Sequence, residues 1–352
     1  MTRLTAWQDI RALRAAPPGE AARDADRQLT FVAALRQAEE LAEAAANASY
    51  ATKALPLFYA LSQAGRAIAA ARLSGTWRLR GHGLTIRENA AQVLETSVHP
   101  GSHPQGSFQG TARAIGSPQL GGLATLGALW TANPDLRYVS PPKSAGSWPT
   151  VLTFPLGTLQ PSLGSDLTYT TVTTTGGTVS TSVDVPGTTG AEISDALQRY
   201  PTLRDAFGVK QGPLGGEAAG PDDVVVRTTD MSGRSLAVIG MPCPYQTTMQ
   251  DYWDRQRAFA SFVERDRAQE RLAPPQFEGF ALPEIAGHPS PHPLLLWWAL
   301  LLGLSSLTRY EPAAWSAAVN LDGSELAVPL EQVLDTAEER LPQRILAALT
   351  AR

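Results

Sequence analysis

Residues 294–307 read LLLWWALLLGLSSL, and this stretch decides how the chain can fold. It is about 14 residues long, shorter than the roughly 20 apolar residues that a helix needs to cross a bilayer. We therefore expect a buried helix and no contact with a membrane. Because such a helix is apolar on every side, it needs protein neighbours on every side.

A second apolar stretch, at residues 53–73, reads KALPLFYALSQAGRAIAAARL. Its alanines allow a neighbouring helix to come close, and its few polar positions include Arg66. Two helices of this kind are the natural cover for each other, although they lie far apart in the sequence. The two ends of the chain are thus expected to share one core.

The periodicity of apolar residues divides the 352 residues into three zones. Residues 1–95 and 246–352 are predicted to be helical, because apolar side chains recur there at three- and four-residue steps. Residues 96–245 contain more glycine, proline and threonine and shorter β-type runs. The predicted fold class is α+β and mainly helical, with a split helical domain from the N- and C-terminal zones and an inserted β-rich lobe.

Local signals place elements within these zones. A β-hairpin is expected at residues 167–185, because Gly176 and Gly177 suit a tight turn. Pro342 is expected to open a final short helix. The remaining predictions are strands at 224–228 and 236–239 and helices at 31–45, 121–131, 191–200, 251–272 and 328–340.

Composition limits the classes of partner and compartment. The net charge is −4, so binding of extended duplex nucleic acid is not expected. Cys243 is the only cysteine, which excludes an intrachain disulfide and a cysteine-based zinc cluster. The first residues lack the apolar core of a secretory signal, so a cytoplasmic location is expected.

Four phrases resemble the YaaC-like family of uncharacterised bacterial proteins. They are LPLFYALSQAGRAIAAA at 55–71, GHGL at 81–84, LLLGLSSLTRYEPAAW at 300–315 and LPQRILAAL at 341–349. Their order and spacing span most of the chain, and SSLTRYEPAAW is the most specific part. The resemblance implies membership of the family and carries no reaction or catalytic residue with it.

The helical part is also similar in style to HEPN domains, many of which cut or accompany RNA. The resemblance implies a nuclease motif in which four to six residues separate an arginine from a later histidine. Here only three residues separate Arg78 from His82, and Arg80 is closer still. The nuclease pattern is therefore not met.

The segment after the second apolar helix is a candidate site. Gly81 and Gly83 flank His82 and would allow a backbone to approach a ligand closely, while Arg78 and Arg80 could hold an anion. Histidine can also move protons near neutral pH. The alternative is a plain turn in which His82 caps a helix or strand end.

The end of the other apolar helix is a second candidate. Arg309 could hold an anionic group while Tyr310 and Trp315 stack on a ring. Alternatively, Arg309 only complements the negative end of the helix dipole. With Arg66, these residues would form an arginine-lined site where the two turns meet.

Metal and cofactor chemistry are not expected. The histidines in HPGSHP and HPSPHP lie beside prolines, which argues against a helical pair of ligands and leaves metal binding from loops as the alternative. The sequence has no GxxxxGK[ST], GxGxxG, GxSxG or HExxH motif.

Three readings of function stay open. The first is a non-catalytic or accessory protein that binds an anionic ligand or a partner macromolecule, such as a nucleotide, RNA or protein. The second is a metal-independent ribonuclease that uses His82 as acid or base. The third is a structural subunit whose arginines all form internal ion pairs.

Overall fold

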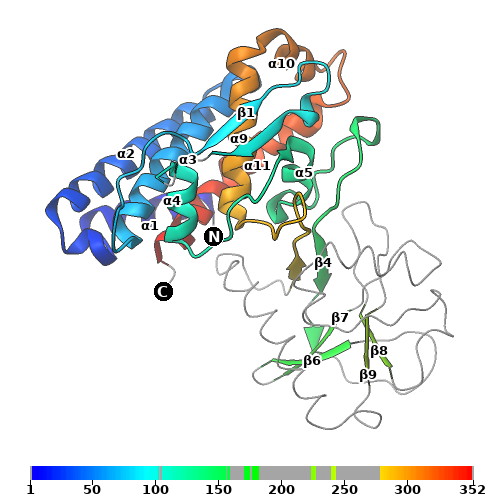
Figure 1. Cartoon of the computed structure of the whole chain (residues 1–352), viewed down its shortest axis with the longest axis horizontal. Coiled ribbons are helices and arrows are strands. Elements are labelled where there is room, and N and C mark those ends of the chain that lie inside the picture. Colours follow the sequence, from blue (N-terminus) through cyan, green and yellow to red (C-terminus); the bar gives the residue numbers. More distant parts are fainter. Residues whose placement is uncertain are drawn as a thin grey trace. The chain divides into compact units, whose positions relative to one another are not determined.

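The computed structural model describes residues 2–101, 103, 105–155 and 278–350, and the strand segments 157–158, 170–174, 177–181, 223–226 and 239–242. The chain forms two compact units. The first, called the helical unit here, comprises Met1–Trp148 and Ile285–Arg352; the second, the inserted lobe, comprises Pro149–Glu284. Both ends of the chain thus contribute to one mainly helical unit, as predicted (Figure 1).

The helical unit contains long helices, short helices and one small sheet. The helices are α1 (Arg3–Ala15), α2 (Ala25–Ala46), α3 (Tyr50–Arg72), α4 (Ser107–Ala114), α5 (Leu126–Thr131), α9 (Pro293–Tyr310), α10 (Pro312–Ala318) and α11 (Ala327–Thr350). The 3-10 turns are η1 (Gly19–Ala22), η2 (Val93–Glu95), η3 (Pro134–Leu136) and η4 (Lys143–Ala145). The strands β1 (Leu84–Arg87), β2 (Ser97–Pro100) and β3 (Ala124–Thr125) pair antiparallel in that order.

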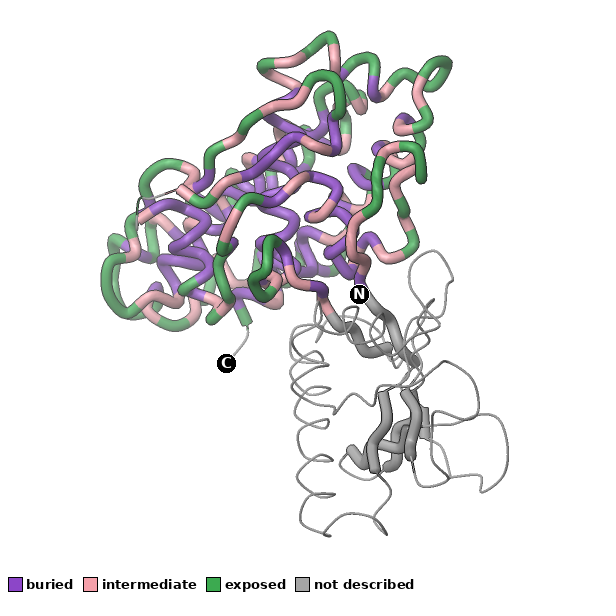
Figure 2. Tube along the Cα trace, turned by 45° about the vertical axis from the view of Figure 1, so that its right-hand side comes forward, coloured by how far each residue is buried: buried purple, intermediate pink, exposed green. Residues whose placement is uncertain are grey.

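Helix α9 lies at the centre of the helical unit. Every residue from Pro293 to Leu307 is buried, which confirms the predicted buried helix. It contacts α3, α4, α5, α10, α11 and the strands β1 and β2, so cover comes from both ends of the sequence. Figure 2 shows the buried residues gathered along the middle of this unit, with exposed residues at its margins.

Helices α3 and α9 come together at a glycine. A Cβ atom on Gly65 would lie 2.4 Å from the Trp298 ring and 2.7 Å from the Thr111 hydroxyl. The ring of Trp298 also lies 6.5 Å from that of Phe58, measured between centroids. The small residue in the second apolar stretch therefore makes room for a tryptophan of the first.

The inserted lobe contains strands β4 (Leu152–Pro155), β5 (Gly157–Thr158), β6 (Thr170–Thr174), β7 (Gly177–Thr181), β8 (Asp223–Val226), β9 (Ile239–Pro242) and β10 (Glu278–Ala281). Pairing of β6 with β7 confirms the predicted hairpin, although Gly177 pairs with Thr174 as part of the strand. Strand β8 pairs with β9, and the observed β9 begins at the last residue of its predicted range. The helices predicted at 191–200 and 251–272 lie outside the described residues.

Two predictions about helix ends in the helical unit are wrong. Pro342 does not open a separate helix, because α11 runs through it from Ala327 to Thr350. Leu341, Pro342 and Ile345 are all buried, and their burial offsets the hydrogen bond that a proline removes from a helix. The helix predicted at 121–131 begins only at Leu126, after β3.

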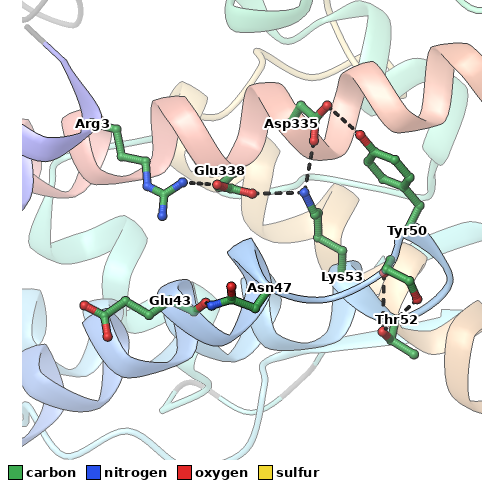
Figure 3. Close-up of polar contacts among 9 residues, drawn as sticks. Arg3, Glu43, Asn47, Tyr50, Thr52, Lys53, Asp335 and Glu338 are labelled. Atoms are coloured by element: carbon green, nitrogen blue, oxygen red, sulfur yellow. Dashed lines mark hydrogen bonds and ion pairs between the residues drawn. The ribbon is translucent and has the colours of Figure 1, made fainter.

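A buried lysine joins the two ends of the chain. Lys53 of α3 is 7% exposed, and its ammonium nitrogen lies 3.0 Å from Asp335 and 3.0 Å from Glu338 of α11. Figure 3 shows the lysine between these two carboxylates, with Tyr50 donating a hydrogen bond to Asp335 (2.8 Å) and Arg3 of α1 paired with Glu338. The hydrogen bond to Asp335 raises the pKa of Tyr50 to about 12. Helices α1, α3 and α11 are thereby held in register.

A second buried ion pair fixes the start of α9. Asp135 of η3 accepts hydrogen bonds from Arg344 of α11 (2.6 and 3.0 Å) and from the Trp297 indole (2.8 Å). Nearby, His292 caps α9 by accepting a hydrogen bond from the Leu294 amide. Burial, together with the charge of Arg344, lowers the pKa of His292 to about 3.

Among the described helices, none is long and apolar enough to cross a membrane.

We predict that Lys53→Met destabilises the protein. Removing the ammonium leaves Asp335 without a cation and leaves Glu338 with Arg3 alone. The expected loss is about 2–3 kcal/mol of unfolding free energy, below the range for a fully buried pair because Asp335 is half exposed. Urea unfolding followed by circular dichroism measures it. A change under about 0.5 kcal/mol, the size of an ordinary surface substitution, would show that the network contributes little.

We also predict a loss of stability in mild acid. The unfolded chain takes up a proton at His292 near pH 6.5, whereas the folded protein does so only near pH 3. Stability from this group is present above pH 6.5 and is lost as the pH falls, by about 2 kcal/mol between pH 7 and pH 5. His292→Asn keeps a capping oxygen and should reduce this dependence by that amount. Unfolding curves at the two pH values measure the loss. The prediction is wrong if the wild type and His292→Asn lose the same unfolding free energy between pH 7 and pH 5.

Candidate functional site

The segment that carries His82 is held on both sides by hydrogen bonds to its backbone carbonyls. Arg27 of α2 donates hydrogen bonds to the carbonyls of Ala70 (3.1 Å) and Gly75 (3.2 Å), and so fixes the chain as it leaves α3. Further along, the carbonyls of Gly81 and His82 accept from the first amides of α4, at 3.2 and 3.1 Å. His82 thus sits in an ordered turn between α3 and β1, and its carbonyl helps to cap α4.

Both glycines beside His82 are required, for different reasons. Gly81 and Gly83 have φ values of +62° and +81°, which side chains disfavour. A Cβ atom on Gly83 would also lie 1.9 Å from the Gln109 side chain, whose amide donates to the Gly83 carbonyl (2.5 Å). Gly83 therefore makes its close approach to the protein's own α4, whereas a Cβ atom on Gly81 would meet nothing within 4 Å.

The His82 ring packs edge-on against two aromatic rings of α3. Its centroid lies 5.2 Å from that of Phe58 and 6.4 Å from that of Tyr59. Burial, then the charge of Arg309, then that of Arg66, lowers the pKa of His82. The imidazole is consequently neutral at pH 7, with two positive charges near it.

Neither of these two arginines is neutralised within the described part of the chain. Arg66 and Arg309 are partly exposed and form no ion pair with a described carboxylate. The Nε atom of Arg66 is buried and has no hydrogen-bond partner there. Arg309 uses Nε to donate to the Ser305 carbonyl (3.3 Å), in keeping with its place in the last turn of α9.

Tyr310 lies next to this group. It is 65% exposed, and the guanidinium carbon of Arg309 lies 4.9 Å from the centroid of its ring. Arg66, His82, Arg309 and Tyr310 form a candidate anion site. We call this group the anion-site cluster. It joins α3, the turn before β1 and the end of α9.

Three other residues that the sequence suggested have no hydrogen bond, ion pair or ring contact with the cluster among the described interactions. Arg78 pairs with Asp26 and stacks on Trp77, while Arg80 is exposed. Trp315 is 1% exposed and donates from its indole nitrogen to the Ala51 carbonyl (2.9 Å). Its ring is part of the core and is not available to stack on a ligand.

The aromatic neighbours of His82 were not singled out from the sequence. Phe58 and Tyr59 stand in an apolar helix, where an aromatic side chain normally signals only burial. Predicting that both rings contact His82 would require knowing that these two adjacent positions of α3 face the turn that carries His82. Only knowledge of where the turn lies could reveal it.

The described residues contain no group of three histidine, cysteine, aspartate or glutamate side chains that could hold a metal ion. His99 instead lies 3.0 Å from the Ser97 hydroxyl, and His292 caps α9. Cys243 lies outside the described residues.

A family model described as YaaC-like Protein matches residues 9–145 and 249–349, well over half of the chain. The matched ranges include every member of the anion-site cluster. Neither a curated protein nor a solved structure matches the chain.

We predict that Arg309→Gln raises the pKa of His82, because it removes a positive charge that disfavours the imidazolium. An NMR titration of the histidine ring protons measures the change. Arg36→Gln on α2, which removes an exposed arginine outside the cluster, serves as the control and should leave the pKa unchanged. Identical titrations of His82 in wild type and Arg309→Gln would show that the two side chains do not interact.

Proposed function

We propose an anion-binding function for this chain, which belongs to the YaaC-like protein family. In this proposal the protein is a non-catalytic or accessory binder, and the anion-site cluster holds the charged group of its ligand. Arg66 and Arg309 contact the anion, and His82 adds a neutral hydrogen-bonding group between them.

The observation that carries the proposal is the pair of arginines without a described carboxylate. Burial is the main cause of the lowered pKa of His82, and the charges of Arg309 and Arg66 near its imidazole lower it further. Elsewhere in the helical unit, the buried cations Lys53 and Arg344 are paired with carboxylates. An anion would compensate the charges of Arg66 and Arg309 in the same way.

A phosphate group suits this arrangement best. Arginine presents a planar fork of donors that matches phosphate oxygens, and two arginines match the two negative charges of a phosphate monoester. A carboxylate needs only one such partner. We therefore expect a phosphorylated ligand.

A ribonuclease is the second candidate, and one observation favours it. A histidine that is neutral at pH 7 can accept a proton from a ribose hydroxyl. Against it stands the spacing from Arg78 to His82, which departs from that of HEPN nucleases. The third reading, a purely structural subunit, would need Arg66 and Arg309 to be paired internally.

We predict that the protein binds inorganic phosphate and that Arg309→Gln and Arg66→Gln each weaken binding about tenfold or more. Each substitution removes a charge-assisted contact of about 1.5–3 kcal/mol. Isothermal titration calorimetry at low salt measures the affinity. Arg36→Gln should bind as the wild type does, since this residue lies on the exposed face of α2.

Equal weakening by Arg36→Gln would indicate a general charge effect and refute a defined site. An RNA-cleavage assay on the same proteins separates the rival function. If the wild type cleaves RNA and a folded His82→Ala variant does not, the protein is a nuclease and the binding proposal is wrong. Absence of phosphate binding by the wild type would refute the proposal altogether.

A further inference from the structure

We propose that the ligand is a free mononucleotide, with its phosphate against Arg66 and Arg309 and its base stacked on Tyr310. This inference rests on the proposed anion-binding function and adds the class of ligand. It depends on three features of the cluster, namely an exposed aromatic ring, its contact with a guanidinium that has no described carboxylate partner, and the acidic residues nearby.

The first feature is the exposure of Tyr310. The residue is 65% exposed at the end of a helix whose preceding turns are buried. Its ring therefore contributes little to the core, and an aromatic face open to solvent can accept a planar ring. Stacking of this kind tolerates any base, since every base has a π-face.

The second feature is the contact between Tyr310 and Arg309. The guanidinium lies over the tyrosine ring, so the charged contact and the stacking surface are adjacent. In a mononucleotide, one ribose joins the phosphate to the base. A single nucleotide can therefore occupy both surfaces, while inorganic phosphate occupies only one.

The third feature is the negative charge beside the cluster, which argues against an RNA chain. Glu311 follows Tyr310 directly, and Glu88 accepts a hydrogen bond from Ser306 of α9 (2.5 Å). Non-specific RNA binding needs a continuous basic path along the backbone. Here Arg78 is paired with Asp26, and the whole chain carries a net charge of −4.

The experiment compares inorganic phosphate, ribose 5-phosphate and the four ribonucleoside 5′-monophosphates by calorimetry. We expect the nucleotides to bind about tenfold more tightly than ribose 5-phosphate, a typical contribution from one stacked base. Tyr310→Ala should abolish this difference between the affinities for the nucleotides and for ribose 5-phosphate. Tyr310→Phe should retain it, because the phenyl ring preserves the stacking surface.

Tyr138 provides a matched control. It is 73% exposed and likewise lies under the guanidinium of the preceding residue, Arg137, at 4.6 Å. Tyr138→Ala removes an equivalent ring in the same kind of pair outside the cluster. Its nucleotide affinity should equal that of the wild type.

The outcomes distinguish this inference from the proposed function. If ribose 5-phosphate binds as tightly as the nucleotides, the mononucleotide is excluded and the anion site stands. If neither these compounds nor inorganic phosphate binds, both proposals fail. Tighter binding of a single-stranded RNA oligonucleotide than of any mononucleotide, lost in Tyr310→Ala, would overturn the free mononucleotide in favour of RNA.

Discussion

The architecture of the helical unit depends on one constraint, the need to surround α9 with protein. A helix with leucine and tryptophan on every face loses the hydrophobic contribution of each side chain left in water, about 1.5–3 kcal/mol apiece. No single neighbour can cover such a helix. Segments from both ends of the sequence therefore converge on it, with α3 and α4 from the first part and α10 and α11 from the last.

Burial alone does not determine how these helices slide or rotate against one another, and the ion pairs supply that specificity. Lys53 binds two carboxylates one turn apart on α11, and Asp135 accepts from Arg344 and Trp297 together. Moving either helix by a turn would leave a charge without its partner. The cationic group at the end of α9 differs from these pairs because it contains arginines without described carboxylates.

Sequence reasoning found the features that depend on composition and missed those that depend on three-dimensional contact. The uniform apolar character of α9 and α3 was sufficient to predict a shared core. The prediction that Pro342 opens a helix was wrong. Local propensity favours a helix start at proline, whereas the burial of the residues on both sides maintains a continuous helix. The burial of Trp315 against Ala51 could not be read from a short alanine-rich segment. The zone boundaries at residues 95 and 245, and the HEPN-like resemblance, stay predictions.

The pairing of β4 with β10 has a consequence for how the sequence can change. Leu152 lies opposite Ala281, so the chain departs for the inserted lobe and comes back through a single two-stranded stem. Changes of length beyond that stem therefore need not alter the packing around α9. Similar changes in the helices around α9 would disturb the core. A lineage could therefore acquire new lobes while it inherits the same helical unit.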